Sequence, residues 1–157
     1  MKTAIVYYSL SGNVEYVAEK IAQNINADLI RIAPVKEYPV KGLRKFFHGG
    51  KSSIAREEPA LKPYQFNGDE YDSIIFGTPV WASNIAPPLR TFIAENSEKL
   101  KGKNISAYLC FKGSGGEAAL KKLNELVNVK DSIILSDPKN RPKESDDLKI
   151  REFCSKI

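Results

Sequence analysis

A run of small, hydroxylated residues close to the start of the chain has the chemistry of a phosphate-binding turn. Ser9, Ser11 and Asn13 can donate hydrogen bonds to phosphate oxygens, and Gly12 lets the backbone approach closely. Residues 14–25 then repeat apolar side chains at helical spacing, so the turn leads into a helix N-terminus. The unpaired N–H groups and positive dipole end of a helix favour an anion there. The turn holds no lysine, which excludes the lysine-containing loop of nucleoside triphosphatases and favours a mononucleotide.

The same turn has a purely structural alternative, because Ser and Asn are also preferred helix caps. On that interpretation Ser11 or Asn13 only begins the helix and binds no ligand. The elements that surround the turn are needed to decide between the two interpretations.

Those elements are short apolar segments that alternate with helical ones. Buried strands are indicated at residues 4–8, 28–32, 71–77, 104–109 and 132–135. Helical patterns follow at residues 14–25, 87–93 and 119–127, and at a last helix that Ser145 would cap. This alternation predicts a single domain, residues 1–157, with an α/β fold built on a doubly wound five-stranded parallel sheet.

Three loops are expected at the carboxyl edge of such a sheet, where ligands bind in this class of fold. They span residues 9–13, 78–84 and 111–116. The second loop contains Trp81, the sole tryptophan of the chain, whose planar indole suits a flat ligand. Small, hydroxylated or aromatic residues in all three loops indicate a ligand site at this edge.

The composition is that of an ordinary soluble globular domain, with 42% hydrophobic residues and a formal net charge of +5 over 157 residues. No run approaches the ~20 apolar residues that a membrane span needs. Met1–Thr3 leads directly into a strand, so no signal peptide is expected. Cys110 and Cys154 lie in apolar contexts, which favours buried structural thiols over a disulfide or metal site. We therefore expect a cytoplasmic protein without a metal.

Two other interpretations remain open. Basic residues crowd the stretch from Lys41 to Arg56, around a possible short helix at residues 42–47, and could bind nucleic acid. No nucleic-acid motif accompanies them, so no such partner is expected. Residues 113–118 also match the dinucleotide pattern G-x-G-x-x-A, with Asp137 about twenty residues further on, although too little chain follows for a second half of that domain.

Taken together, the motifs resemble those of the flavodoxin family. Residues 8–14, Tyr-Ser-Leu-Ser-Gly-Asn-Val, are similar to its phosphate loop, with Val14 where the motif often has a hydroxyl. Residues 77–81, followed by Pro87-Pro88-Leu89-Arg90-Thr91-Phe92, are similar to its second flavin loop. Residues 113–116 fall where the third flavin loop would be. The resemblance extends from Lys2 to the last helix.

The resemblance implies a flavodoxin-like fold of the short-chain type, with strand order 2-1-3-4-5 and non-covalently bound FMN. It implies that the phosphate is held by Ser9, Ser11, Gly12, Asn13 and Val14. The second loop would supply Thr78 and, along the isoalloxazine, Pro79, Val80, Trp81 and Asn84. The polar edge of the flavin would be bordered by Phe111, Lys112, Gly113 and Gly116.

The implied function is electron transfer, with redox partner proteins or small acceptors such as quinones as partners. The short chain favours an electron carrier, and the alternative is an NAD(P)H-dependent FMN or quinone reductase that works by two-electron steps. The basic balance and Lys112 favour the reductase, because a cation near flavin N1 would stabilise the anionic reduced form. No catalytic nucleophile or acid–base pair is visible, and the oligomeric state is not indicated.

Overall fold

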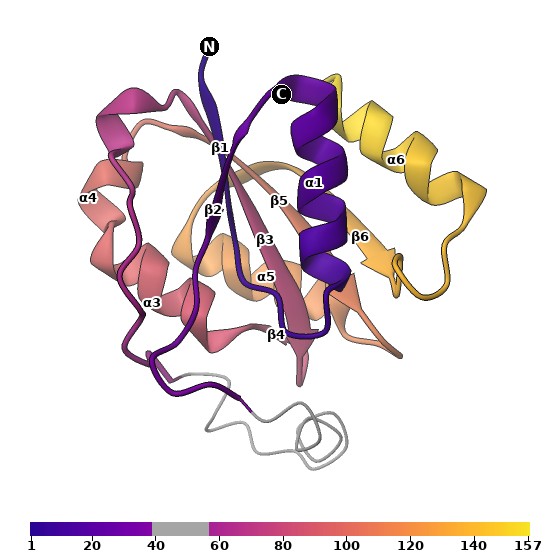
Figure 1. Cartoon of the computed structure of the whole chain (residues 1–157), viewed down its shortest axis with the longest axis horizontal. Coiled ribbons are helices and arrows are strands. Elements are labelled where there is room, and N and C mark those ends of the chain that lie inside the picture. The colour runs from indigo at the N-terminus through magenta and orange to yellow at the C-terminus, as the bar shows by residue number, and fades with distance from the viewer. Residues whose placement is uncertain (39–56) are drawn as a thin grey trace.

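The computed structural model describes residues 1–38 and 57–157 (Figure 1). Its strands are β1 (Thr3–Tyr7), β2 (Asp28–Arg31), β3 (Ser73–Trp81), β4 (Asn84–Ile85), β5 (Asn104–Phe111) and β6 (Val129–Ser136). Its helices are α1 (Asn13–Ile25), the short 3-10 helix η3 (Gly68–Glu70), α3 (Pro87–Glu95), α4 (Ser97–Leu100), α5 (Gly116–Leu126) and α6 (Glu144–Cys154). The helix expected at residues 42–47 and the basic cluster Lys41–Arg56 lie outside the described residues.

Five parallel strands form the sheet in the order β2-β1-β3-β5-β6. Counting these parallel strands along the chain gives 2-1-3-4-5, so the predicted doubly wound sheet and its order are confirmed. The two-residue strand β4, which pairs antiparallel with the end of β3, was not predicted. The order also separates this fold from the dinucleotide-binding alternative, whose sheet has the order 3-2-1-4-5-6.

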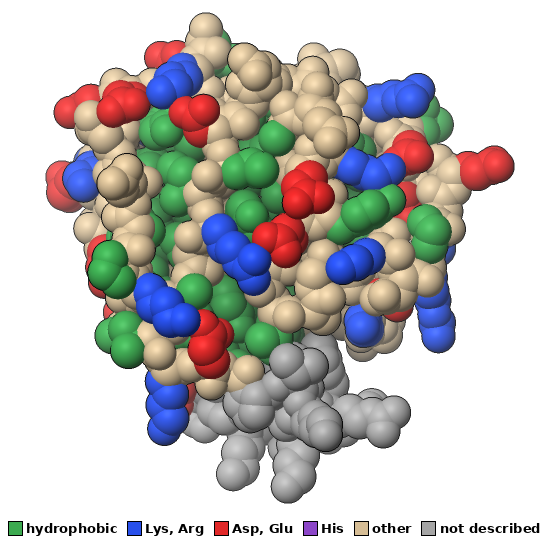
Figure 2. All heavy atoms as spheres, in the orientation of Figure 1, with side chains coloured by type: hydrophobic (Ala, Val, Ile, Leu, Met, Phe, Trp, Pro, Cys, Tyr) green, Lys and Arg blue, Asp and Glu red, His purple; other side chains and the backbone are tan. Residues whose placement is uncertain are grey.

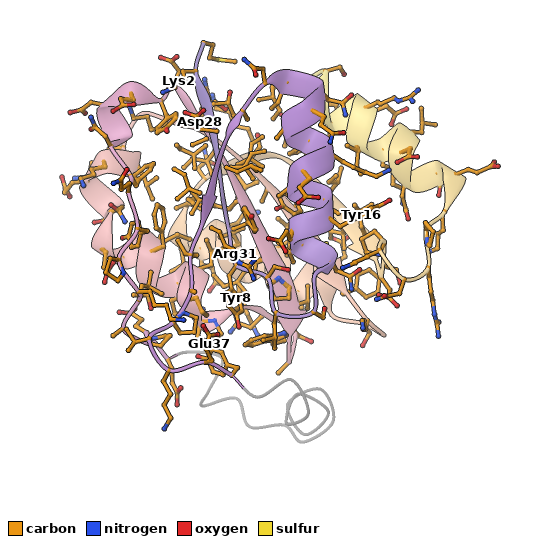
Figure 3. All side chains as sticks on the ribbon, viewed as in Figure 1. Lys2, Tyr8, Tyr16, Asp28, Arg31 and Glu37 are labelled. Atoms are coloured by element: carbon orange, nitrogen blue, oxygen red, sulfur yellow. The ribbon has the colours of Figure 1, made fainter. Side chains whose placement is uncertain are left out.

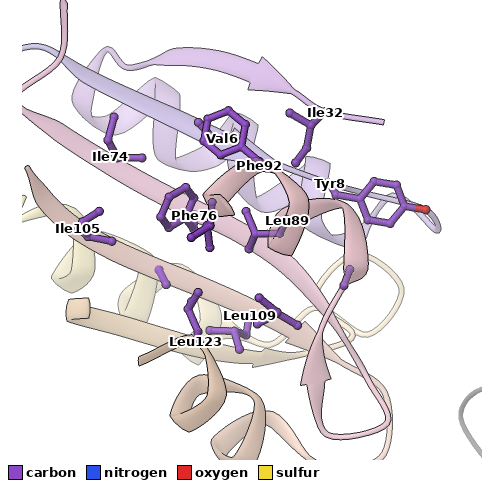
Figure 4. Close-up of a cluster of buried hydrophobic side chains, with 14 of the residues drawn as sticks. Val6, Tyr8, Ile32, Ile74, Phe76, Leu89, Phe92, Ile105, Leu109 and Leu123 are labelled. Atoms are coloured by element: carbon purple, nitrogen blue, oxygen red, sulfur yellow. The ribbon is translucent and has the colours of Figure 1, made fainter. Parts of the chain in front are cut away.

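Helices cover both faces of the sheet, and successive side chains of the central strands alternate between the two faces. Val6 and Phe76 point to the face covered by α3 and α5 (Figure 4). Ile5 and Ile75 point to the face covered by α1 and α6. The central strands therefore have no solvent side, which explains their unbroken apolar runs. Charged side chains of both signs are interspersed over the surface shown in Figure 2.

Two expectations from composition can be compared with this fold. Cys110 and Cys154 are both buried and unpaired, as predicted for structural thiols. Within residues 1–38 and 57–157, no helix combines the length and the apolar character needed to cross a membrane.

The prediction that residues 78–84 form a loop was wrong for most of that stretch. β3 continues through Trp81, and the chain reverses at Ala82 and Ser83, whose φ values are +48° and +58°. Val80 then pairs with Ile85 in the short strand β4. Two left-handed residues form the tight turn that matches strand twist, but Ala and Ser rarely adopt this conformation, so the sequence gives no sign of a hairpin here.

Several element boundaries also differ from the prediction, those of β6 and α6 among them. β6 begins at Val129 rather than at residue 132, because an edge strand can expose polar residues such as Lys130. Helix α6 begins at Glu144, so Ser145 is inside the helix and does not cap it. The backbone N–H of Lys143 instead donates to the carboxylate of Asp146 at 3.2 Å.

A buried tyrosine connects the sheet to the start of α1. The Tyr108 ring, from β5, lies over Gly77 of β3, and its hydroxyl donates to the carbonyl oxygen of Val14 at 3.0 Å. Burial raises the pKa of Tyr108 well above its ordinary value, so the hydroxyl stays protonated and can donate. A Cβ on Gly77 would lie 2.2 Å from the Tyr108 hydroxyl oxygen, so this strand position requires glycine for space.

We predict that Gly77→Ala destabilises the protein by about 2–3 kcal/mol, because the added methyl group overlaps the Tyr108 ring. The free energy of unfolding in urea measures this effect. Gly102→Ala is the control: no atom lies within 4 Å of its added Cβ, so only the left-handed φ of +74° is strained, at about 1 kcal/mol. Equal losses in the two variants would contradict the close contact with Tyr108.

Candidate functional site

The carboxyl ends of the parallel strands lie at one edge of the sheet, at the bottom of Figure 1, and the predicted site residues lie on the loops that follow them. Two contacts join these loops. Asn13, after β1, is hydrogen-bonded to Asp137, after β6. Gly115, after β5, packs against Ser83 at the turn between β3 and β4. The fold therefore brings the three predicted loops together and adds a fourth, the loop after β6.

The predicted phosphate loop, residues 9–13, has backbone donors that lack acceptors in the described part of the chain. Gly12 has a φ of +92° and is the N-cap of α1. The backbone N–H groups of Ser11, Gly12 and Asn13 donate to no acceptor in the described part of the chain. The Ser11 side chain is exposed, while the buried Ser9 hydroxyl accepts from the N–H of Glu15 at 3.2 Å. Free N–H groups at a helix N-terminus, beside an exposed hydroxyl, fit a phosphate group.

The alternative that Ser11 or Asn13 merely caps α1 was wrong, because neither side chain bonds to the helix backbone. Asn13 is 5% exposed and bridges to the loop after β6. Its Nδ2 donates to Asp137 Oδ1 at 2.8 Å, and its Oδ1 accepts from the N–H of Lys139 at 2.9 Å. The buried side chain of Asn13 is thus engaged within the protein, while its backbone N–H has no acceptor in the described chain, and Val14, 1% exposed, offers only its N–H.

Asp137 is the acidic centre of this edge, and sequence reasoning placed it only in the discarded dinucleotide pattern. Partial burial is the largest single influence on the pKa of its carboxyl, and by itself would raise that pKa. Hydrogen bonds from Asn140 and Asn13, together with the nearby cations Lys112 and Arg141, outweigh burial and hold the pKa below its ordinary value. Lys112 Nζ lies 3.8 Å from Asp137 Oδ1. Asp137 is therefore an anion at neutral pH and partly balances the charge of Lys112.

The second predicted loop places its polar side chains inside the protein. The hydroxyl of Thr78, which is fully buried, accepts from the N–H of Ala86 at 2.9 Å and donates to the carbonyl of Pro79 at 2.9 Å. Asn84 is 3% exposed, and its Oδ1 accepts from Arg90 Nη2 at 3.2 Å. These two side chains hold the β3–β4 hairpin in place, while Pro79 is only half-buried.

Trp81 is 4% exposed and belongs to an aromatic cluster with Tyr8 and Tyr38. Its ring meets Tyr8 edge-on at 5.7 Å between centroids, and Tyr38 edge-on at 5.2 Å. Val80, which is 3% exposed, is buried beside it. The indole thus packs at the carboxyl edge against two tyrosines that the sequence analysis did not assign to the site.

Tyr8 contributes a second feature that the sequence did not reveal. Its hydroxyl is buried and, among residues 1–38 and 57–157, has no hydrogen-bond partner. Burial raises the pKa of Tyr8, so the hydroxyl remains a neutral donor. Figure 4 shows the ring at the carboxyl end of β1, and Figure 3 shows it near Arg31 and Glu37, whose charges act on it. A buried donor without an acceptor is an unmet interaction at the site's edge.

The third predicted loop packs tightly on one side and is open on the other. A Cβ on Gly115, whose φ is +96°, would lie 2.7 Å from Ser83 Oγ, and one on the buried Gly116 would lie 2.5 Å from Ile134. Gly113 has open space around it, and Lys112 is exposed beside it. Phe111 is half-buried at the end of β5. A ligand at this edge can therefore reach Phe111, Lys112 and Gly113 but not Gly116.

Other parts of the described chain offer less to a ligand. A groove of about 450 Å³ along β6, between α5 and α6, is lined by charges of both signs, including Lys130, Asp131 and Lys149, and by none of the predicted site residues. Within residues 1–38 and 57–157, no group of three His, Cys, Asp or Glu side chains could hold a metal ion.

A flavodoxin family model matches residues 2–153, nearly the whole chain. The chain belongs to the flavodoxin family. The resemblance that was carried by the phosphate loop and the two flavin loops is therefore confirmed at the level of the family and the fold.

Solved structures of the same fold include a candidate flavoprotein from Bacteroides eggerthii, with 25% identity, a TM-score of 0.79 and coverage of 99% of this chain and 97% of that one. A flavoprotein from Lactobacillus acidophilus, solved in complex with FMN, has 23% identity, a TM-score of 0.65 and coverage of 88% and 95%. A WrbA-like flavodoxin from Agrobacterium tumefaciens has 17% identity, a TM-score of 0.63 and coverage of 98% and 95%.

We predict that Asn13→Asp destabilises the protein by about 2–3 kcal/mol at pH 7, because it sets a second carboxylate against Asp137. The loss should shrink as the pH falls towards 4.5 and the pair takes up a proton. In the wild type, the lowered pKa of Asp137 means that this carboxylate keeps its stabilising contribution above the ordinary carboxyl range and loses it only at lower pH.

Urea unfolding at both pH values measures this difference. Asn140→Asp is the matched control, because Asn140 Nδ2 also donates to Asp137, at 2.7 Å, but from an exposed position where repulsion is screened. A loss in Asn13→Asp that does not change between pH 7 and pH 4.5 would contradict the charge explanation.

Proposed function

We propose that this chain binds FMN non-covalently at the carboxyl edge and transfers electrons through it. The observation that carries the proposal is the phosphate loop, where three backbone N–H groups lack acceptors in the described chain and the exposed Ser11 lies beside them at the N-terminus of α1. Membership of the flavodoxin family and the FMN bound by the Lactobacillus acidophilus neighbour support the choice of ligand.

In this proposal Ser9 shapes the phosphate loop, while Ser11 and the N–H groups of Gly12, Asn13 and Val14 hold the phosphate. The isoalloxazine lies between Pro79 and Phe111, the half-buried residues of the second and third loops. The remaining assigned residues would not contact the flavin but would support the site. Thr78 and Asn84 fix the β3–β4 hairpin, and Val80 and Trp81 form a buried apolar wall beside it. Gly116 allows the third loop to pack against Ile134. Bound FMN would supply the redox chemistry, so the chain needs no catalytic side chain of its own.

An electron carrier is the favoured role, with redox proteins or small acceptors such as quinones as partners. An NAD(P)H-dependent reductase is the second candidate, and the position of Lys112 favours it. The Lys112 side chain is 48% exposed and extends from the loop that would border the polar edge of the flavin. A cation there stabilises the doubly reduced anionic flavin, although Asp137, 3.8 Å away, reduces this effect.

Stepwise anaerobic reduction of the purified protein tests the proposal. We expect a yellow protein that releases FMN on heating and shows a long-lived one-electron-reduced flavin, as a carrier requires. Direct passage to the two-electron-reduced state would favour the reductase instead. A colourless protein that takes up no added FMN would refute FMN binding itself.

We predict that Lys112→Ala lowers the reduction potential for the second electron by on the order of 40 mV, because a cation near the anionic flavin is lost. Spectroelectrochemical titration of the FMN-loaded protein measures this potential. Lys99→Ala on α4, at the opposite edge of the sheet, removes the same charge and should leave the potential unchanged. An unmoved potential in Lys112→Ala would show that Lys112 does not act on the flavin.

A further inference from the structure

One lysine of the loop after β6 lies directly over the phosphate loop. If Gly12 carried a Cβ, the ammonium nitrogen of Lys139 would lie 2.8 Å from it, and Lys139 Cδ and Cε would lie at 3.5 and 3.7 Å. The side chain therefore covers the glycine at which the N-terminus of α1 begins. Lys139 is 127 residues from Gly12 in sequence, so no local motif relates them.

The position of Lys139 is held by the protein itself. Its backbone N–H donates to Asn13 Oδ1 at 2.9 Å, while the Nδ2 of the same amide donates to Asp137. Asp137 adopts a left-handed φ of +47°, and its own N–H donates to the carbonyl of Phe111 at 2.9 Å. These bonds hold the backbone of the loop after β6 beside Gly12. The Lys139 side chain therefore starts from a fixed backbone position.

The electrostatics at this position call for an anion. The ammonium lies at the positive end of the α1 dipole, where a cation is unfavourable. Lys112 and Arg141, the neighbouring cations, both pair with Asp137. Across the described residues, by contrast, no carboxylate lies within 4 Å of Lys139 Nζ. A phosphate between the free N–H groups of the loop and this ammonium would satisfy both.

We propose that Lys139 binds the phosphate monoester of the flavin and makes the site selective for FMN over riboflavin, which lacks that group. The inference rests on the proposed function. Lys139, beside Gly12, supplies a charge-assisted donor, and the backbone N–H groups of residues 11–13 supply the neutral donors. The site thus obtains its cation from the loop after β6, which explains why the turn at residues 9–13 needs no lysine of its own.

Titration calorimetry of the full chain, freed of flavin, with FMN and with riboflavin tests this assignment. We expect Lys139→Gln to weaken FMN binding about tenfold at low salt, because one partly exposed charge-assisted hydrogen bond is lost. Riboflavin binding should not change, and Lys139→Arg should restore FMN affinity. FMN affinity should also fall less steeply with added salt in Lys139→Gln than in wild type.

Lys99→Gln, which removes the same charge at the opposite edge, is the control and should bind both flavins as wild type does. If Lys139→Gln binds FMN as tightly as wild type does, the inference is overturned. An equal loss of affinity for FMN and for riboflavin also overturns it, because that result would indicate a packing role for the side chain. Wild type that binds neither flavin overturns the proposed function, and the role of Lys139 with it.

Discussion

The geometry of the carboxyl edge depends on the side-chain amide of Asn13. The amide joins the start of α1 to the loop after β6 through bonds of 2.8 and 2.9 Å to Asp137 and to the N–H of Lys139. Helices α1 and α6 pack side by side on the same face of the sheet (Figure 1). The loops that precede them, after β1 and after β6, therefore both lie at the carboxyl edge. Because the amide is buried, breaking either bond would leave a buried polar atom unpaired.

This link gives the edge its distribution of charge. Asp137 is kept ionised by its hydrogen bonds and balances Lys112, while Lys139 remains over the phosphate loop without a carboxylate partner among the described residues. The edge thus has neutral donors and one uncompensated ammonium at the proposed phosphate position, and a balanced ion pair near the proposed polar edge of the flavin. In the proposed function, this arrangement would bind the phosphate monoester of FMN and would perturb the flavin only modestly, as the carrier role requires.

The sheet and its order could be predicted because the central strands are buried on both faces and carry unbroken β-branched and aromatic runs. The turn between β1 and α1 could be predicted, and proposed as a phosphate site, because its residue types and the helix after it are adjacent in sequence. The hairpin at Ala82 and Ser83 could not, since left-handed residues there depend on the pairing of Val80 with Ile85. Side-chain roles that join distant loops were also hidden, as with the amide of Asn13, whose partner lies 124 residues away.

The central claim is that the phosphate loop is the place where the chain binds its flavin. The most direct test is a titration of the ¹⁵N-labelled, flavin-free protein with FMN, followed through its backbone amide signals. The account predicts that the largest shifts occur at residues 11–14, whose N–H groups lack acceptors in the described chain, and at Gly113, which has open space around it. Shifts confined to the groove between β6 and α6, around Lys149, or no shifts at saturating FMN, would contradict it.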